Sequence, residues 1–277
     1  MLFRSRLQSA ACPVRELAGS LGLPVLQPER ASTPESIEAL AAFKPDLLVV
    51  AAYGQILRQA LLDVAPRGAI NIHPSLLPKY RGAAPIQWAI ANGDTETGVA
   101  ILHVTARMDA GDLILMERAP IAPDDTAGSL EPRLAAVGAR LLVRALDLFA
   151  TPPVPRTPQD EAQVVLAPKL AKEDGRIDWT MPAETIRNRI RGFSPWPGCF
   201  TTVPGTPPVT LKIHAAEVEA SSGDPGTVLE AGPKGIRVAC GTGSLRLVRI
   251  QPEGRPAMTD AAYCCGRRDL AGLRLGA

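Results

Sequence analysis

Apolar runs of strand length alternate with amphipathic stretches of helical period through the first 150 residues. The clearest run, residues 47–52, is unbroken, which is typical of a strand buried on both faces of a parallel sheet. We expect further strands at 23–26, 70–73, 98–104 and 113–118, and helices at 13–21, from 33, and at 56–64, 85–91 and 129–149. This alternation predicts an α/β domain, Rossmann-like, with a mostly parallel sheet.

The pattern changes after residue 150. Residues 151–168 contain five prolines, which predicts a semi-rigid linker. Short apolar runs at 209–213, 227–229, 236–239 and 245–250, separated by Gly and Pro turns, predict a small β-barrel. We therefore divide the chain into a first domain over 1–150, a linker over 151–175 and a second domain over 176–277.

Two polar side chains close the expected strand at 70–73. Asn71 and His73 are two residues apart, so in a strand they point to the same face, and Pro74 then ends the strand. This spacing fits a functional site, and it fits a hydrogen-bonded polar pair at a strand end equally well. Ligands of parallel sheets bind beyond the carboxyl ends of the strands. Residues 53–55, Asn71, His73 and Asp109 follow expected strand ends, and we expect them to meet on one rim of the sheet.

A longer motif follows Asn71. The stretch 71–87, NIHPSLLPKYRGAAPIQ, resembles the signature of the 10-formyltetrahydrofolate-dependent formyltransferases, and its ending RGAAPIQ most resembles the branch that acts on methionyl-tRNA. Residues 108–112, MDAGD, resemble the second catalytic segment of that family. The resemblance implies a Rossmann-like formyltransferase domain, followed by an OB-like β-barrel that helps to hold the tRNA.

Formyl transfer requires an amine to attack a formyl carbon, which creates a tetrahedral intermediate with an oxyanion. Each prepositioned donor at such an oxyanion is worth roughly 3–4 kcal/mol. Asn71 offers an amide N–H, and His73 offers an imidazole that donates or shuttles a proton. Asp109 would hold that imidazole or help to deprotonate the amine. Taken alone, Asp109 would be a turn cap before Gly111, and Ser75 lacks the Gly-x-Ser-x-Gly elbow of a serine nucleophile.

The resemblance also implies binding residues. The folate-contacting loop comprises Ser75, Leu76, Leu77 and Pro78, and the pterin pocket is lined, mainly through backbone groups, by Gln55, Ile56 and Leu57. The expected phosphate contacts to tRNA are basic side chains: Arg4 and Arg6, which could equally form a solvated tail, and Arg189, Arg191, Lys212 and Arg246. His103 and His214 are expected to be structural.

Composition is that of an ordinary globular protein. The 277 residues are 46% hydrophobic and 21% charged, and the apolar runs are far shorter than a membrane helix of about 18 residues requires. Residues 1–150 hold 14 basic and 15 acidic side chains, and the remainder holds 16 and 13, so the second half is mildly basic. The five cysteines lack metal-ligand spacing and predict reduced thiols, without a metal site. We expect a cytoplasmic monomer of bacterial type, although the acid-free, Arg-rich start also fits an organellar transit peptide.

The chain departs from the family at its start. The family begins with a strand, a Gly-Thr-Pro-type loop and a helix, for which we find no counterpart here. The absent strand should lie in the middle of the sheet and leave two strands without a partner. Two alternatives therefore stay open beside methionyl-tRNA formylation. One is formylation of an amino sugar nucleotide, and the other is a non-catalytic tRNA- or folate-binding remnant.

Overall fold

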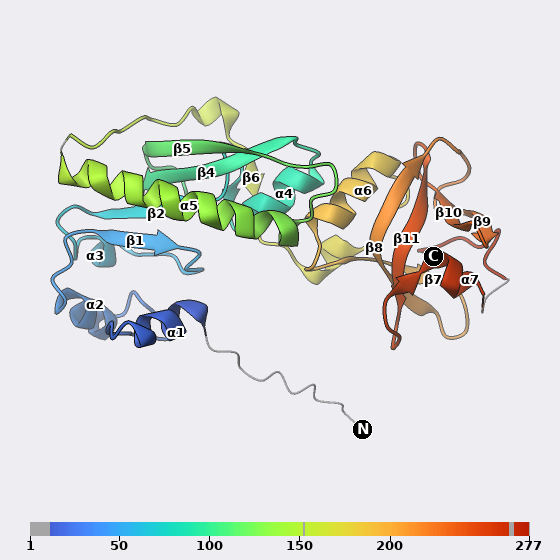
Figure 1. Ribbon diagram of the computed structural model, residues 1–277, viewed down its shortest axis with the longest axis horizontal. Helices are drawn as coiled ribbons and strands as arrows, with labels where there is room; N and C mark the ends of the chain where they lie inside the picture. The colour runs from blue at the N-terminus through green and yellow to red at the C-terminus, as the bar shows by residue number, and fades with distance from the viewer. Residues whose placement is uncertain (1–11, 152, 266–268, 277) are drawn as a thin grey trace, which may run out of the picture.

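The computed structural model describes residues 12–151, 153–265 and 269–276. Two domains follow each other along the long axis of the molecule, and helices α4 (Pro85–Ala91) and α6 (Ala183–Gly192) meet where the domains join (Figure 1). Each domain has its own large cluster of buried apolar side chains. Among the described helices, none is both long enough and apolar enough to cross a membrane.

The first domain is built on a four-stranded sheet. Its strands are β1 (Leu48–Ala51), β2 (Ala69–His73), β4 (Glu96–His103) and β5 (Leu113–Pro120), in the order β1-β2-β4-β5. The α/β class is confirmed. Within this four-stranded sheet, however, only β1 and β2 pair in parallel, while β4 runs antiparallel to both β2 and β5. The sheet is mixed here because β4 and β5 form a hairpin, which a pattern of apolar runs does not distinguish from a crossover.

Helix α5 (Ala127–Ala150) covers one face of this sheet, close to the length expected from its apolar periodicity. Thr126 and Ser129 cap its first turn reciprocally, with backbone N–H groups donating to both hydroxyls. The helix packs closely at Gly138, where an added Cβ would lie 3.0 Å from a methyl group of Ile72. Ile72 therefore faces α5. Its neighbours Asn71 and His73 face the opposite side of the sheet.

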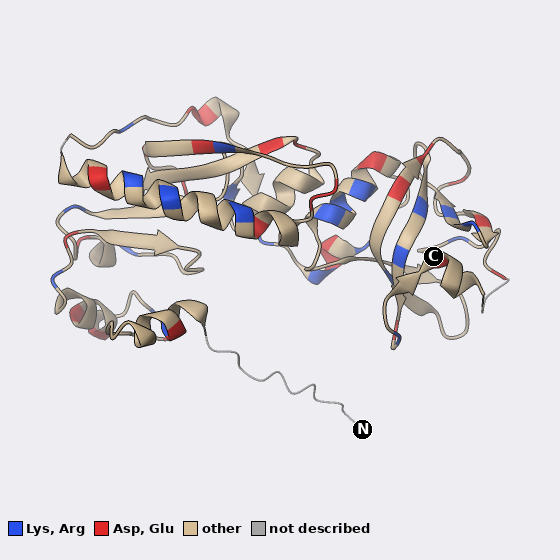
Figure 2. Cartoon of the chain, viewed as in Figure 1, with Lys and Arg blue, Asp and Glu red and all other residues tan. Residues whose placement is uncertain are grey.

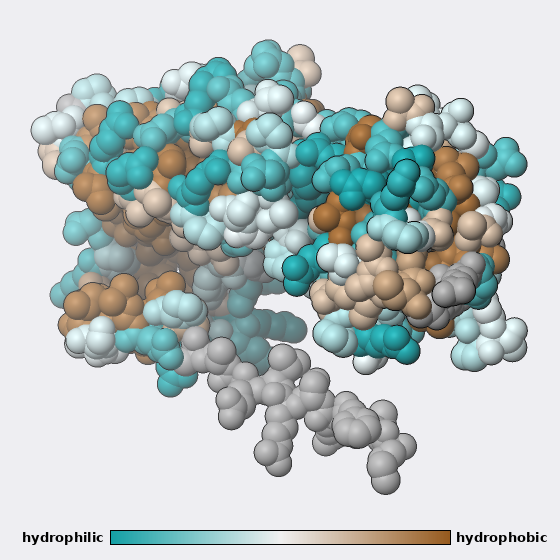
Figure 3. Space-filling view, turned by 45° about the vertical axis from the view of Figure 1, so that its right-hand side comes forward, coloured by the Kyte–Doolittle hydropathy of each residue, from teal (hydrophilic) through white to brown (hydrophobic). Residues whose placement is uncertain are grey.

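The N-terminal helices α1 (Pro13–Ser20) and α2 (Pro34–Ala41) form where their prolines and caps predict them, but they bury no residue. The expected strand at 23–26 is absent, and Leu23 is 56% exposed. Within the described residues, no strand pairs with the outer edge of β1. An extended segment needs a neighbouring strand for its backbone hydrogen bonds, and here residues 23–26 have none. Figure 3 shows apolar residues on the surface of this domain.

The second domain is an antiparallel sheet in the order β7-β8-β11-β10-β9, with a short strand β12 paired to β11. Its strands are β7 (Cys199–Val203), β8 (Val209–Glu219), β9 (Val228–Gly232), β10 (Gly235–Ala239), β11 (Ser244–Pro252) and β12 (Met258–Thr259), followed by helix α7 (Asp260–Cys264). The C-terminal segment bridges the two edge strands. The backbone N of Val228 donates to O of Leu273 (2.9 Å), and that of Gly276 donates to O of Thr202 (2.8 Å).

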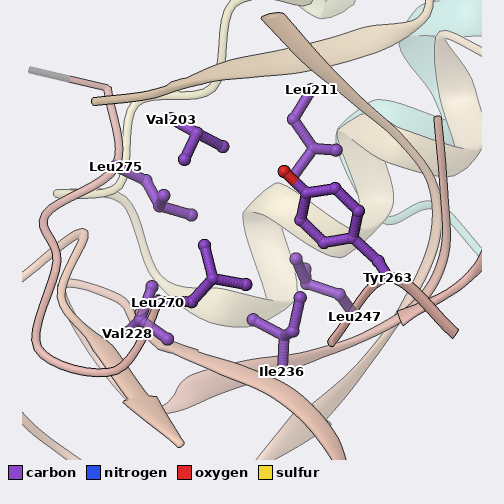
Figure 4. A pocket seen from close by; sticks show the side chains of 8 residues that line it. All are labelled: Val203, Leu211, Val228, Ile236, Leu247, Tyr263, Leu270 and Leu275. Atoms are coloured by element: carbon purple, nitrogen blue, oxygen red, sulfur yellow. The ribbon is translucent and has the colours of Figure 1, made fainter. Parts of the chain in front are cut away.

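Apolar side chains fill the interior of the second domain. Leu211, Leu247, Tyr263 and Leu275 are among those that converge there in Figure 4. They leave a cavity of about 10 Å³, which holds at most one water molecule. The interior of this domain is therefore a packed core.

Helix α6 joins the two domains. Its Gly192 lies against α4, where an added Cβ would come within 2.6 Å of the backbone oxygen of Gln87. The rings of Trp88 and Phe193 meet edge to face, with 5.6 Å between centroids. The guanidinium of Arg191 donates to the backbone oxygens of Ala122 (3.3 Å) and Asp125 (3.1 Å). These contacts fix the second domain against the first.

Candidate active site

Strand β2 carries two of the expected site residues on one face, as the two-residue spacing predicts. His73 is only 4% exposed, and its Nε2 lies 2.9 Å from the backbone oxygen of Tyr80. A carbonyl oxygen only accepts hydrogen bonds, so Nε2 carries a proton. The other ring nitrogen, Nδ1, lies 3.7 Å from Oδ2 of Asp109. Nδ1 is therefore the nitrogen that can gain and lose a proton beside the carboxylate.

The carboxylate of Asp109 connects three segments. Its Oδ1 accepts a hydrogen bond from Nδ2 of Asn71 (3.4 Å), and its Oδ2 accepts one from the backbone N of Gly82 (3.0 Å). Asp109 has a φ of +49°, a left-handed conformation that non-glycine residues rarely adopt. The structure thus brings together Asn71, His73 and Asp109, which the sequence places up to 38 positions apart.

The route that Asp109 takes to the site differs from the expected one. Because β4 is antiparallel to β2, the loop 104–112 leaves the sheet beside the start of β2, where the backbone N of Val104 donates to O of Ala69 (2.8 Å). The loop then returns over the face that carries Asn71 and His73. The prediction that all three segments follow carboxyl ends on one rim is wrong for Asp109, although the side chains still meet.

The side chains of the expected folate loop are mostly packed inward. Ser75 is fully buried, and its Oγ donates to the backbone oxygen of Lys79 (2.7 Å), so the hydroxyl does not serve His73 as a nucleophile would. Leu77 packs against β4, and Leu76 lies within 2.5 Å of the position a Cβ of Gly98 would take. Pro78 is half-buried. A ligand at this loop would therefore meet mainly its backbone.

The second expected folate segment follows β1. Since β1 and β2 are parallel and Ala51 lies opposite Ile72, residues 55–57 emerge beside the end of β2 that carries His73. The amide of Gln55 bonds to backbone groups of residues 29 and 31. Ile56 is 86% exposed and Leu57 is half-buried. The side chain of Gln55 is therefore engaged within the chain, whereas the backbone of this segment and the side chain of Ile56 are open to a ligand.

Residues 151–175, the interdomain segment, contact the site. The sequence predicted a linker here but not this contact. Strand β6 (Leu166–Ala167) pairs with β3 (Arg81–Gly82), next to the Gly82 N–H that binds Asp109. Earlier in the segment, Nε2 of Gln159 donates to the backbone oxygens of Asp109 and Gly111, each at 2.8 Å. Proline content alone predicted a linker. The one sequence feature that pointed to a contact with the site was the polar stretch 159–161 among the prolines.

Most of the basic side chains expected to bind tRNA have partners within the chain. Arg246 pairs with two glutamates on β8, Arg189 lies over the Phe193 ring, and Arg191 is taken up by the domain junction. Lys212 is exposed on β8. Figure 2 shows that basic and acidic residues both occur along the strands of the second domain. Arg4 and Arg6 lie outside the described residues.

Three titratable side chains outside this cluster, His103, Cys199 and Cys240, are buried. His103 is 7% exposed, and burial lowers its pKa below the ordinary value of 6.5. Burial raises the pKa of the Cys199 and Cys240 thiols to about 12, so both thiols stay protonated. Throughout the residues that the structure describes, His, Cys, Asp and Glu side chains form no group of three able to hold a metal ion.

Both domains match a known protein family. The formyl transferase family profile matches residues 3–146, and the profile of the formyl transferase C-terminal domain matches residues 169–268. A methionyl-tRNA formyltransferase of Myxococcus xanthus is 48% identical over 258 residues, which cover 93% of this chain and 82% of that protein. One from Anaeromyxobacter sp. is 50% identical over 256 residues, covering 91% and 81%.

Among solved structures, HypX from Aquifex aeolicus in complex with tetrahydrofolic acid shares the fold, with a TM-score of 0.60 and 22% identity. The match covers 82% of this chain and 40% of HypX. The two profiles together span both domains, and the sequence relatives are similar over nearly the whole chain. The chain therefore belongs to the formyltransferase family.

Proposed function

We propose that this chain transfers the formyl group of 10-formyltetrahydrofolate to the amino group of initiator methionyl-tRNA. The observation that carries this proposal is the cluster of Asn71, His73 and Asp109, found in a chain 48% identical to a methionyl-tRNA formyltransferase across 93% of its length. The cluster supplies an amide donor and a protonatable ring nitrogen, each within 4 Å of the carboxylate of Asp109. Acyl transfer to an amine needs these three groups.

Each side chain has a role that follows from its contacts. The amine nitrogen attacks the formyl carbon, and the formyl oxygen gains the negative charge of the tetrahedral intermediate. Asn71 uses one amide hydrogen on Asp109 and keeps the other for that oxyanion. The proton lost by the amine passes to Nδ1 of His73, where the charge of Asp109 stabilises the imidazolium. His73 then returns a proton to the folate nitrogen as its bond to the formyl carbon breaks.

The substrates are held by the segments around this cluster. We assign the formyl donor to the backbone of residues 55–57 and 75–78, two segments that follow the paired parallel strands β1 and β2. We assign tRNA contacts to Lys212 and to Arg4 and Arg6. Because the guanidinium of Arg191 donates to backbone oxygens at the domain junction, Arg191 contributes to tRNA binding only indirectly, by fixing the second domain. The enzyme acts as a monomer in the cytoplasm, where its tRNA substrate is used.

The test is formyl transfer by the purified chain, with methionyl-tRNA and 10-formyltetrahydrofolate as substrates. His73→Ala should lower kcat by about 10²- to 10⁴-fold, the usual contribution of a general acid–base group. His214→Ala is the matched control because His214 is exposed on β8 in the second domain. Near-normal turnover in His73→Ala would contradict the assigned role.

The same assay separates the alternatives. An amino sugar nucleotide offered in place of methionyl-tRNA should not be formylated, and preferential formylation of the sugar would replace the proposed substrate. A wild-type chain that binds tRNA or folate without turnover would instead favour a non-catalytic binding protein.

A further inference from the structure

The side chain of Gln159 has every hydrogen-bonding atom engaged. Its Nε2 donates to the backbone oxygens of Asp109 and Gly111, both at 2.8 Å. Its Oε1 accepts from Nε and Nη2 of Arg81, at 3.0 and 2.9 Å. Arginine can only donate and a carbonyl can only accept, so the amide of Gln159 can point in only one direction. Gln159, a single side chain of the interdomain segment, thus bonds to the residue before Ala110 and to the residue after it.

The loop that Gln159 holds is the one that presents Asp109. With a φ of +49°, Asp109 lies in a conformation that is unfavourable for a residue with a Cβ, so surrounding contacts must maintain it. Its carboxylate is bound on the site side by Asn71 and by the N–H of Gly82. Its backbone oxygen, on the other side, is bound by Gln159. Gln159 therefore sets the direction of the peptide that follows Asp109.

Arg81 fixes Gln159 in turn. Its side chain is 5% exposed, and besides Gln159 it binds Glu161 through Nη2 (3.0 Å) and Nη1 (3.3 Å). Ala167, the residue of β6 that pairs with Gly82, follows Glu161 by only a few positions in the chain. Gln159, Arg81 and Glu161 therefore form one polar network that contacts the loop of Asp109. Gln159 and Glu161 belong to the interdomain segment.

We propose that Gln159 is a positioning residue for formyl transfer, which acts by holding Asp109 in its productive conformation. Through it, the placement of the segment that carries the second domain is coupled to the catalytic carboxylate. This inference rests on the role given to Asp109 in the proposed function. Gln159 lies behind the loop and does not touch the reacting atoms.

Two substitutions test the donors of Gln159 separately from its acceptor. Gln159→Ala removes all four hydrogen bonds, whereas Gln159→Glu keeps the length and the acceptor for Arg81 but has no N–H. Both should lower kcat by about 10- to 100-fold, the range that two lost hydrogen bonds cover, with the KM for either substrate changed less than about threefold. Gln163→Ala is the matched control, since Gln163 is exposed in the same segment and bonds only to Asp160. It should be unchanged.

A double-mutant cycle with Asp109→Asn distinguishes positioning from a purely structural role. If Gln159 acts through Asp109, Gln159→Ala should cost less than about twofold in the Asp109→Asn background. An undiminished effect there would overturn the inference, and so would full activity of Gln159→Glu. Low activity of Asp109→Asn together with normal activity of Gln159→Ala would refute this inference and leave the proposed function standing. Near-normal activity of Asp109→Asn refutes the proposed function and this inference with it.

Discussion

Replacing Gly82 by alanine tests how closely the interdomain segment approaches the carboxylate of Asp109. Gly82 has a φ of +127°, and an added Cβ would lie 2.5 Å from the backbone oxygen of Ala167. Cβ contacts this short do not occur, and the obstacle is backbone. The variant must therefore separate β3 from β6, while its own N–H is the group that binds Oδ2 of Asp109.

The cost follows from these contacts. A residue with a Cβ in this backbone conformation loses about 1–3 kcal/mol. Separating the strands weakens the hydrogen bonds from the backbone N of Arg81 to O of Val165 and from that of Ala83 to O of Ala167, both 2.9 Å long, at about 1 kcal/mol each. Gly82→Ala should therefore lower the free energy of unfolding by about 3–5 kcal/mol. At about 2–4 °C per kcal/mol, Tm should fall by at least about 6 °C.

Thermal unfolding and formyl transfer are measured together on the variant. Gly68→Ala is the matched control, because Gly68 belongs to the same domain, has a φ of +75° and has open space around its Cβ position. The control should lose only the conformational cost of about 1–2 kcal/mol and should keep its kcat. Gly82→Ala should lose activity at temperatures where it is still folded. Equal Tm shifts in the two variants, with normal turnover in Gly82→Ala, would refute the close approach.

Three further substitutions test other parts of the molecule. Burial lowers the pKa of His103, so below about pH 6.5 the unfolded chain binds a proton more readily than the folded chain, and the free energy of unfolding falls. When urea unfolding is compared at pH 7 and pH 5, His103→Phe should lose less stability than the wild type. An equal loss in the two proteins would contradict this. Lys212→Ala should weaken tRNA binding and reduce its salt dependence by about one counterion, whereas an unchanged slope would remove Lys212 from the interface. The outer edge of β1 pairs with no strand among the described residues, so Val49→Lys on this strand should reduce light scattering by concentrated protein, and equal scattering would show that the edge is harmless.

Local patterns predicted the parts of the site that depend on neighbouring residues. The period of a strand places Asn71 and His73 on one face, and Pro74 ends that strand in any tertiary context. The apolar period of residues 129–149 likewise predicted α5 to within two residues at either end. The resemblance of the stretch 71–87 to formyltransferases added the expectation that Asp109 joins the pair.

Features that depend on distant partners could not be read from local patterns. Strand length and apolarity do not state whether β4 runs parallel or antiparallel, so the approach of Asp109 across the sheet was missed. Residues 23–26 have the composition of a strand but remain irregular, because β-structure also requires a partner. The importance of Gln159 depends on backbone oxygens some 50 positions away. Charge likewise did not predict that Arg191 would be occupied at the domain junction.

Backbone pairing ties the interdomain segment to the first domain on both sides of Gln159, and this limits how the length of the segment can vary. Thr157 exchanges backbone hydrogen bonds with Leu113, and Leu166 and Ala167 pair with β3. One residue inserted between these tethers would displace the chain by about 3.3 Å and pull directly on the peptide of Asp109. A residue inserted beyond Pro168, whose backbone oxygen accepts from Nε1 of Trp88 (2.9 Å), would leave these contacts in place and change the spacing between the domains. Chimaeras that exchange the second domain should therefore place their junction after Pro168 and keep the preceding segment intact.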